Sequence, residues 1–321
     1  MLINPSEFIG LEGITHLCAG GETPMFKSHL DTVDRFFRDK LLGEEGRGKF
    51  EAVSYRCKEK VADLFQVKAD DIAFLSSTSE GINLLVHALD WKPGDNIVVA
   101  DVEFPSDVLP WTRLKDRGVE LRIVRNKDWR TELDALSEAM DDRTRLVALS
   151  HVSYFTGQRL PLKELSDMVH SHGALLSLDV THSAGVVPVE AEYADIVVSS
   201  CYKWLMGVHG VGIFYWNRER LPDLQPPFVG WHTPALMPDA KDPSSFIPRK
   251  DASRFTPGNE TFIGVYILDN ALDELHKIGI PNIEAHVLRL SRRIWEGLTE
   301  MGWEVITPGA PEERAGNVCF M

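Results

Sequence analysis

The chain has 321 residues, of which 44% are hydrophobic and 26% charged, a composition typical of a folded globular protein. It excludes a disordered, a collagenous and a disulfide-stapled chain. The 48 acidic residues outnumber the 34 basic ones and give a formal net charge of −14. Phosphate backbones and anionic membranes repel such a chain, so neither nucleic acid nor a membrane is an expected partner.

Cysteine spacing and the absence of long apolar runs point to an intracellular setting. The four cysteines form no CxxC pair, so no metal site and no thioredoxin motif are expected. The first residues lack the charged and apolar regions of a secretory signal. No apolar run reaches the roughly 18 residues of a membrane span. We therefore expect a soluble, cytoplasmic protein.

Seven short apolar runs predict strands in the first two thirds of the chain. They consist mainly of branched and aromatic side chains, which suits a sheet covered on both faces. Helical patterns at residues 133–140 and 162–172 lie between them. This alternation predicts an α/β fold with a mainly parallel sheet covered by helices. The runs are residues 71–75, 96–100, 121–124, 146–150, 174–180, 194–200 and 211–216.

Two stretches break the alternation. Residues 43–49 are rich in glycine and are expected to form a solvated connector. Residues 221–257 contain eight prolines and show little periodicity, so we expect a long irregular lid or connector there.

The last part of the chain predicts the start of a second domain. Helical patterns cover residues 261–278 and 282–301, a short strand is expected at 303–307, and another begins at 317–321. At about 150 residues per domain, the length suggests two domains. The predicted parts are an N-terminal segment (1–20), a large domain (21–260) and a smaller, incomplete C-terminal α+β domain (261–321).

Polar residues follow several predicted strands, at the edge where α/β sheets bind ligands. Residues 76–81 carry hydroxyls at a helix start, which fits either an ordinary capping box or a phosphate cradle. Phe104 is by default a core ring, Asp179 a helix cap and Lys203 a surface lysine. Tyr154, in a polar turn, offers a hydrogen-bond donor.

Together, these strand-end residues point to one cofactor more specifically than any of them does alone. A lysine, a carboxylate, an aromatic ring and a phosphate cradle, each from a different strand end, are the groups that pyridoxal 5′-phosphate requires. The lysine forms a Schiff base with the aldehyde, and the carboxylate keeps the pyridine nitrogen protonated.

The motifs SLDVTHSAG (177–185) and SSCYKWLMGVHGVG (199–212) resemble the class V aminotransferases, a family of fold-type I pyridoxal-phosphate enzymes. The resemblance spans roughly residues 75–264 and includes branches such as cysteine desulfurases, kynureninases and isopenicillin-N-epimerase-like proteins. It implies the large domain typical of that fold.

The resemblance implies a role for each matching residue. Lys203 is the Schiff-base lysine, Asp179 pairs with the pyridine nitrogen, and His182 lies near the phenolic oxygen. Phe104 stacks on the cofactor ring, and Tyr154 lies near the substrate. The phosphate contacts fall on Thr78, Ser79, Ser200 and Tyr202.

One matching segment implies a homodimer with shared active sites. Residues 254–259 correspond to the segment that reaches the neighbouring subunit's phosphate in this family. Asn259 departs there from the commoner threonine.

The predicted function is a pyridoxal-phosphate enzyme acting on an amino acid as a transaminase, epimerase or lyase. Phe104, His182 and Tyr154 depart from the desulfurase pattern, so a cysteine desulfurase or selenocysteine lyase is the first alternative. The desulfurase loop cysteine and the carboxylate-binding arginine are expected beyond residue 321. A non-catalytic scaffold or regulator of the same fold is the second alternative. The glycine string 207–212 precedes a strand, which disfavours a dinucleotide-binding dehydrogenase. The sequence leaves the substrate open.

Overall fold

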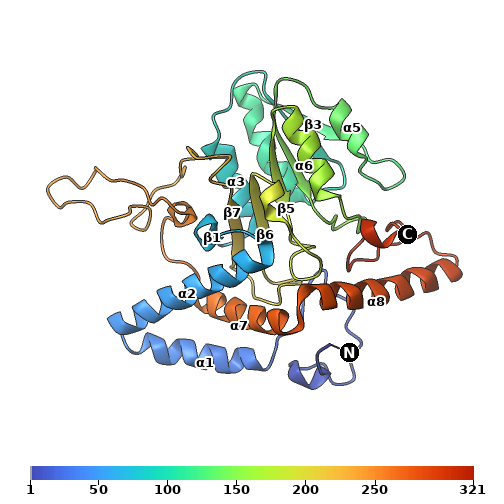
Figure 1. Cartoon of the computed structure of the whole chain (residues 1–321), viewed down its shortest axis with the longest axis horizontal. Helices are drawn as coiled ribbons and strands as arrows, with labels where there is room; N and C mark the ends of the chain where they lie inside the picture. Colours follow the sequence, from blue (N-terminus) through green and yellow to red (C-terminus); the bar gives the residue numbers. More distant parts are fainter. Residues whose placement is uncertain (1) are drawn as a thin grey trace.

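The computed structural model describes residues 2–321, and one seven-stranded sheet forms its centre (Figure 1). The strand order is β1-β7-β6-β5-β4-β2-β3, with β7 antiparallel to both neighbours and the remaining pairs parallel. All seven predicted strands and the mainly parallel sheet are confirmed. The strands are β1 (Ile72–Leu75), β2 (Asn96–Ala100), β3 (Glu120–Val124), β4 (Thr144–Ser150), β5 (Leu175–Asp179), β6 (Ile196–Ser200) and β7 (Gly212–Trp216).

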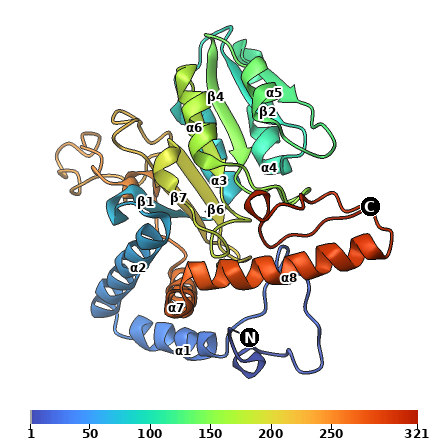
Figure 2. The ribbon, with the colours of Figure 1, turned by 45° about the vertical axis from the view of Figure 1, so that its right-hand side comes forward.

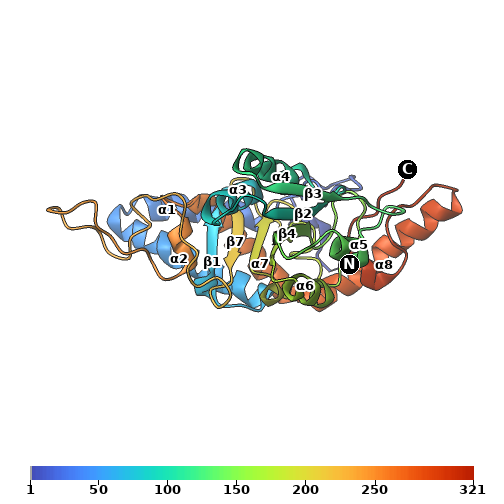
Figure 3. The same cartoon turned by 90° about the horizontal axis from the view of Figure 1, so that it is seen from above.

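Helices cover both faces of the sheet, because its central strands are apolar on both sides. Side chains of α3 and the 3₁₀ helix η3 (Leu109–Arg117) pack on one face, and those of α2, α5, α6 and α7 pack on the other. Figure 3 shows α3 and α6 on opposite sides of the sheet. The helices are α1 (Ser28–Lys40), α2 (Glu44–Phe65), α3 (Thr78–Ala88), α4 (Pro105–Val108), α5 (Leu133–Glu138), α6 (Leu162–Ser171), α7 (Phe262–Ile278) and α8 (Ile280–Glu300).

The expected connector at residues 43–49 is wrong, because α2 begins at Glu44. The glycine at position 46 permits a close helix contact. A Cβ atom on Gly46 would lie 1.9 Å from the Asp39 carbonyl oxygen near the end of α1. The glycine therefore lets α1 and α2 approach each other.

The strand expected at residues 303–307 is also wrong. Val305 makes only an isolated antiparallel bridge with Phe320. In residues 2–321, this segment and the end of the chain pair with each other and with no third strand, so no strand is assigned to either. Both predicted helices before it are confirmed as α7 and α8.

The proline-rich segment is irregular, as predicted. Residues 221–257 contain the short 3₁₀ helix η5 (Ala252–Phe255) and an isolated bridge between Pro234 and Pro248. This segment extends away from the sheet in both views (Figures 1 and 2).

No helix in residues 2–321 is long and apolar enough to cross a membrane. The domain boundaries at residues 20 and 260 stay a prediction.

Candidate active site

Lys203 lies in a turn just beyond β6, at the sheet edge where the parallel strands end. Its Nζ atom lies 2.9 Å from His182 Nε2 and 5.7 Å from the centroid of the Phe104 ring. Burial lowers the pKa of Lys203, while the negative charges of Asp179, Glu22 and Asp107 act in the opposite direction. A desolvated amine of this kind serves as nucleophile and base.

The turn that carries Lys203 is held by Glu22 and Thr23, near the start of the chain. Thr23 Oγ1 donates to the carbonyl oxygens of Tyr202 and Lys203, at 3.1 and 2.9 Å. Tyr202 stacks on His209 at 3.9 Å, and His209 Nε2 lies 3.0 Å from a carboxylate oxygen of Glu22. The backbone of Lys203 is therefore fixed from a part of the chain about 180 residues away.

Asp179 ends β5 and is buried. Its Oδ1 atom accepts a hydrogen bond from the backbone N–H of Thr181, at 2.6 Å. Burial raises the pKa of Asp179, and the Thr181 hydrogen bonds and the charge of Lys203 partly offset that effect.

Two further buried carboxyls lie beside Asp179, and sequence reasoning did not single them out. Asp107 lies close enough to Asp179 for each carboxyl to shift the pKa of the other, and its Oδ2 atom is buried without a hydrogen-bond partner. Glu103 Oε2 accepts from the Ser150 hydroxyl at 2.5 Å. Burial, together with the neighbouring carboxylates, raises the pKa of Asp107 well above its usual range and that of Glu103 to about 7. Protons are thus retained among these three groups near neutral pH.

Hydroxyl groups gather at the N-terminus of α3. Thr78 Oγ1 lies 2.9 Å from Ser200 Oγ and 3.3 Å from Thr181 Oγ1. Ser79 Oγ lies 2.7 Å from Ser106 Oγ. A helix N-terminus with clustered hydroxyls suits an anion such as phosphate.

The same helix start is capped, as the alternative interpretation predicted. Ser77 accepts a hydrogen bond from the backbone N–H of Glu80 at 3.2 Å. Capping and anion binding are compatible here because the cap uses the hydroxyl of Ser77 and leaves Thr78 and Ser79 with other partners.

His182 connects Lys203 to the last segment of the chain. Asn317 Nδ2 donates to His182 Nδ1 at 2.9 Å, on the opposite side of the ring from Lys203. Burial is the main cause that lowers the pKa of His182 to about 3. A positive charge on Lys203 would act in the same direction and the Asn317 hydrogen bond acts in the opposite one, so the ring is neutral at pH 7. No local sequence signal marks Asn317, because its contact with His182 bridges 135 residues.

Phe104 is not a core ring, so its default interpretation is wrong. It is 42% exposed, and the edge of Tyr154 meets it at 5.1 Å and 89°. The start of α4 presents this ring at the open edge of the sheet, where it faces the Lys203 amine.

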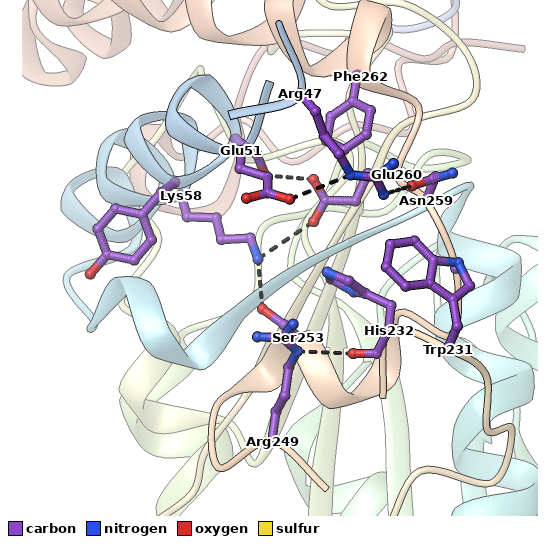
Figure 4. A pocket seen from close by; sticks show the side chains of 13 residues that line it. Arg47, Glu51, Lys58, Trp231, His232, Arg249, Ser253, Asn259, Glu260 and Phe262 are labelled. Carbon is purple, nitrogen blue, oxygen red and sulfur yellow. Dashed lines mark hydrogen bonds and ion pairs between the residues drawn. The ribbon is translucent and has the colours of Figure 1, made fainter. Parts of the chain in front are cut away.

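Asn259 lines a pocket with Ser76 and Glu80, beside the start of α3. It accepts a hydrogen bond from Arg47 Nη2 at 3.2 Å and lines a cavity of about 320 Å³ (Figure 4). Lys58 and Glu260 form an ion pair of 3.5 Å in the same cavity, and Trp231 borders it.

The residues at the sheet edge fit pyridoxal phosphate. Lys203 matches the aldehyde and the buried acid Asp179 matches the pyridine nitrogen. Phe104 supplies a ring surface, and the hydroxyls of Thr78 and Ser200 suit the phosphate. Residues 2–321 contain no group of three or more His, Cys, Asp or Glu residues arranged for a metal.

Fold and site together define a fold-type I pyridoxal-phosphate enzyme. The aminotransferase class-V family model matches residues 44–321, and the chain belongs to that family. Its relatives include a probable cysteine desulfurase of Methanothermobacter thermautotrophicus, 28% identical over 87% of this chain and 71% of the relative. A probable cysteine desulfurase of Pyrococcus abyssi is 33% identical over 82% of this chain and 66% of the relative.

A solved structure gives the same fold. The apo cysteine desulfurase of Thermococcus onnurineus superimposes with a TM-score of 0.89 at 24% identity, covering 98% of this chain and 80% of that one. The predicted family, fold class and cofactor are confirmed. The role of each site residue stays a prediction.

Proposed function

We propose that Lys203 is the cofactor-binding and proton-transferring residue of an enzyme that acts on the Cα atom of an amino acid. The observation that carries this proposal is the position of its amine between His182 and Phe104, beside the charge of Asp179. Burial makes the amine available in its unprotonated form.

When bound, pyridoxal phosphate supplies a ring that withdraws electrons from the substrate's Cα. In the proposed mechanism, Asp179 would hold the proton at the ring nitrogen. Burial raises the pKa of the neighbouring acids Asp107 and Glu103, so they would add less negative charge beside it. The Lys203 amine takes and returns the Cα proton. Phe104, whose ring lies 5.7 Å from the Lys203 amine, would offer the cofactor ring a flat surface to rest against and so help to orient the bond that breaks.

The test is the visible spectrum of the purified protein as amino acids are added, alongside Lys203→Ala. We expect a yellow band that individual amino acids shift in the wild type and no such response in the variant. Lys163→Ala, an exposed lysine paired with Asp167, is the matched control and should behave as the wild type. A band in Lys203→Ala that responds to amino acids as in the wild type would contradict the assignment and favour the scaffold alternative.

Transamination, epimerisation and elimination differ in where the proton returns, and Lys203 serves all three. The second candidate is a lyase acting on sulfur amino acids, which the two desulfurase relatives favour. Product analysis separates them. Cysteine and cystine should give sulfide or persulfide for a sulfur lyase. With an added keto-acid acceptor, a transaminase should give a keto acid that retains the sulfur atom, and an epimerase should give the opposite enantiomer.

We further propose a cytoplasmic homodimer in which Asn259 completes the partner's phosphate site. This is supported by the resemblance of residues 254–259 to the family segment that reaches the partner's phosphate, and by the position of Asn259 in an open cavity beside Arg47 and Trp231. The test mixes Lys203→Ala with Asn259→Asp, each expected to be inactive alone. Shared sites predict that the mixture regains activity, because some dimers combine two intact contributions in one site. A monomeric mass in solution, or no recovery of activity on mixing, would overturn the proposed homodimer.

The net charge of −14 favours neither nucleic acid nor membrane as a partner.

A further inference from the structure

Asn317 is fitted closely between three segments of the chain. Its Nδ2 atom donates to His182 Nδ1 at 2.9 Å. A Cβ atom on Gly20 would lie 2.9 Å from Asn317 Oδ1, and one on Gly157 would lie 2.9 Å from the Asn317 carbonyl oxygen. Gly20 therefore makes room for the side chain of Asn317, and Gly157, in the loop after β4, makes room for its backbone.

The hydrogen bond from Asn317 determines which nitrogen of His182 carries the proton. A neutral imidazole has one N–H and one acceptor nitrogen. Because Nδ1 accepts from Asn317, Nε2 carries the hydrogen. Nε2 lies 2.9 Å from Lys203 Nζ, and an N–H can donate there only if the lysine is an unprotonated amine with a free lone pair.

Turning the Asn317 amide around would place the hydrogen of His182 on Nδ1. The two ends of an asparagine amide have the same shape, and its partners decide its orientation. With Oδ1 turned to Nδ1–H, Nε2 would be an acceptor and Lys203 would donate to it as an ammonium ion. Asn317 Oδ1 instead points away from His182 and is buried without a partner.

We propose that Asn317 is a positioning residue that fixes His182 in the Nε2–H tautomer and so holds Lys203 as a free amine. The groups that act on Lys203 from the surrounding elements are Asp179, Glu22 and Asp107, which favour the ammonium form, together with the neutral His182 ring. Asn317 is the neutral group that opposes these acids through His182. The inference rests on the proposed function only in taking Lys203 as the reactive amine.

The primary test is nitrogen NMR of the full chain labelled with ¹⁵N-histidine, with its cofactor and again after cofactor removal. His182→Gln assigns the signal. We expect Nε2 to be the protonated nitrogen in the wild type. A wild-type protein with the hydrogen on Nδ1 overturns the proposal without any Asn317 variant having to fold.

Two variants extend the test. Asn317→Asp presents only acceptors, so it should move the hydrogen to Nδ1 and raise the pH at which Lys203 becomes reactive by about one unit or more. Asn317→Leu keeps a similar size and should give a mixture of tautomers. Asn282→Asp adds the same charge on an exposed part of α8, where Asn282 bonds only the Ile278 carbonyl, and should change neither readout.

Lys203 reactivity is read as the pH profile of the rate at which cofactor-free protein forms its visible band with added pyridoxal phosphate. An unchanged tautomer and an unchanged profile in Asn317→Asp would contradict the proposal. Failure of the proposed function is separate: no band would form at any pH, while the histidine tautomer would still be measurable in the cofactor-free chain.

Discussion

At Lys203, burial and charge act in opposite directions on one amine. Burial favours the neutral form, and the nearby acids favour the charged form. The acids do not overwhelm the effect of burial because protons remain among Glu103, Asp107 and Asp179. The balance between the neutral and the charged form of Lys203 therefore depends on how many protons these three buried carboxyls hold.

Asp179→Asn tests the carboxyl expected to hold the ring proton. An amide cannot carry that negative charge, so turnover should fall by about 10²–10⁴-fold and the cofactor should bind more weakly. Turnover and the visible band at rising cofactor concentration measure both. Asp167→Asn, an exposed position paired with Lys163, is the control and should leave both unchanged. Full turnover in Asp179→Asn would show that another group carries the proton.

Glu103→Gln tests the proton held beside the site. The pKa of Glu103 rises from its usual 4.5 to about 7 because the carboxyl is buried. The folded state keeps this proton where the unfolded state has lost it, so its stabilising contribution is complete below pH 4.5 and is lost as pH rises through about 7.

The glutamine variant can accept from the Ser150 N–H through its amide oxygen and donate to the Ser150 hydroxyl through its amide nitrogen, and it carries no titrating group. Its stability relative to wild type should increase between pH 5 and pH 8. Chemical denaturation at the two pH values measures this difference, with the exposed Glu138→Gln as control. A relative stability that stays constant across this range contradicts the assignment.

At the scale of elements, the packing of α1 against α2 depends on one glycine. Gly46→Ala would place a methyl group against the Asp39 carbonyl, so we expect a loss of about 1–3 kcal/mol of unfolding free energy. Gly48 lies in the same helix with nothing within 4 Å, so Gly48→Ala should stabilise the protein by about 0.5–1 kcal/mol. Denaturant titration measures both, and equal effects of the two substitutions would exclude the close-contact explanation.

Helix α1 also carries a buried histidine that makes the fold sensitive to acid. His29 has no hydrogen-bond partner on either ring nitrogen and meets the edge of Phe26 at 5.3 Å. Burial lowers the pKa of His29 from 6.5 to about 4, although the charge of Glu274 acts the other way. Its stabilising contribution is therefore present above pH 6.5 and is lost as pH falls through about 4.

His29→Leu should remove that part of the acid sensitivity. We expect the melting temperature of the variant, relative to wild type, to rise as pH falls from 7 to 4.5. The exposed His16→Leu is the control and should follow the wild type. An unchanged difference across this pH range would show that His29 does not contribute.

The sequence predicted the elements that follow a local rule. Apolar branched runs predicted all seven strands, and periodicity predicted α5, α6, α7 and α8. Local patterns failed where a partner from elsewhere decides the outcome. Residues 303–307 read as a strand but have only an isolated bridge. The glycines of residues 43–49 read as a connector, although Gly46 serves a helix contact.

At the scale of the whole molecule, the sheet edge explains which site residues could be predicted. Lys203, Asp179, His182 and Thr78 follow strands directly, so chain order already placed them at one edge. Asn317 and Thr23 reach the site from opposite ends of the chain, and only tertiary packing reveals them. Asp107 was hidden for a different reason, because a short acidic helix start looks like an ordinary cap.

The central claim is that Lys203 binds the cofactor covalently. The most direct measurement is peptide mass spectrometry after borohydride reduction of the purified protein loaded with pyridoxal phosphate. We expect the mass of the reduced cofactor on the peptide that contains Lys203, and its loss in Lys203→Ala. Modification of another lysine in its place, such as the buried Lys58, or no fixed cofactor at all, would contradict it.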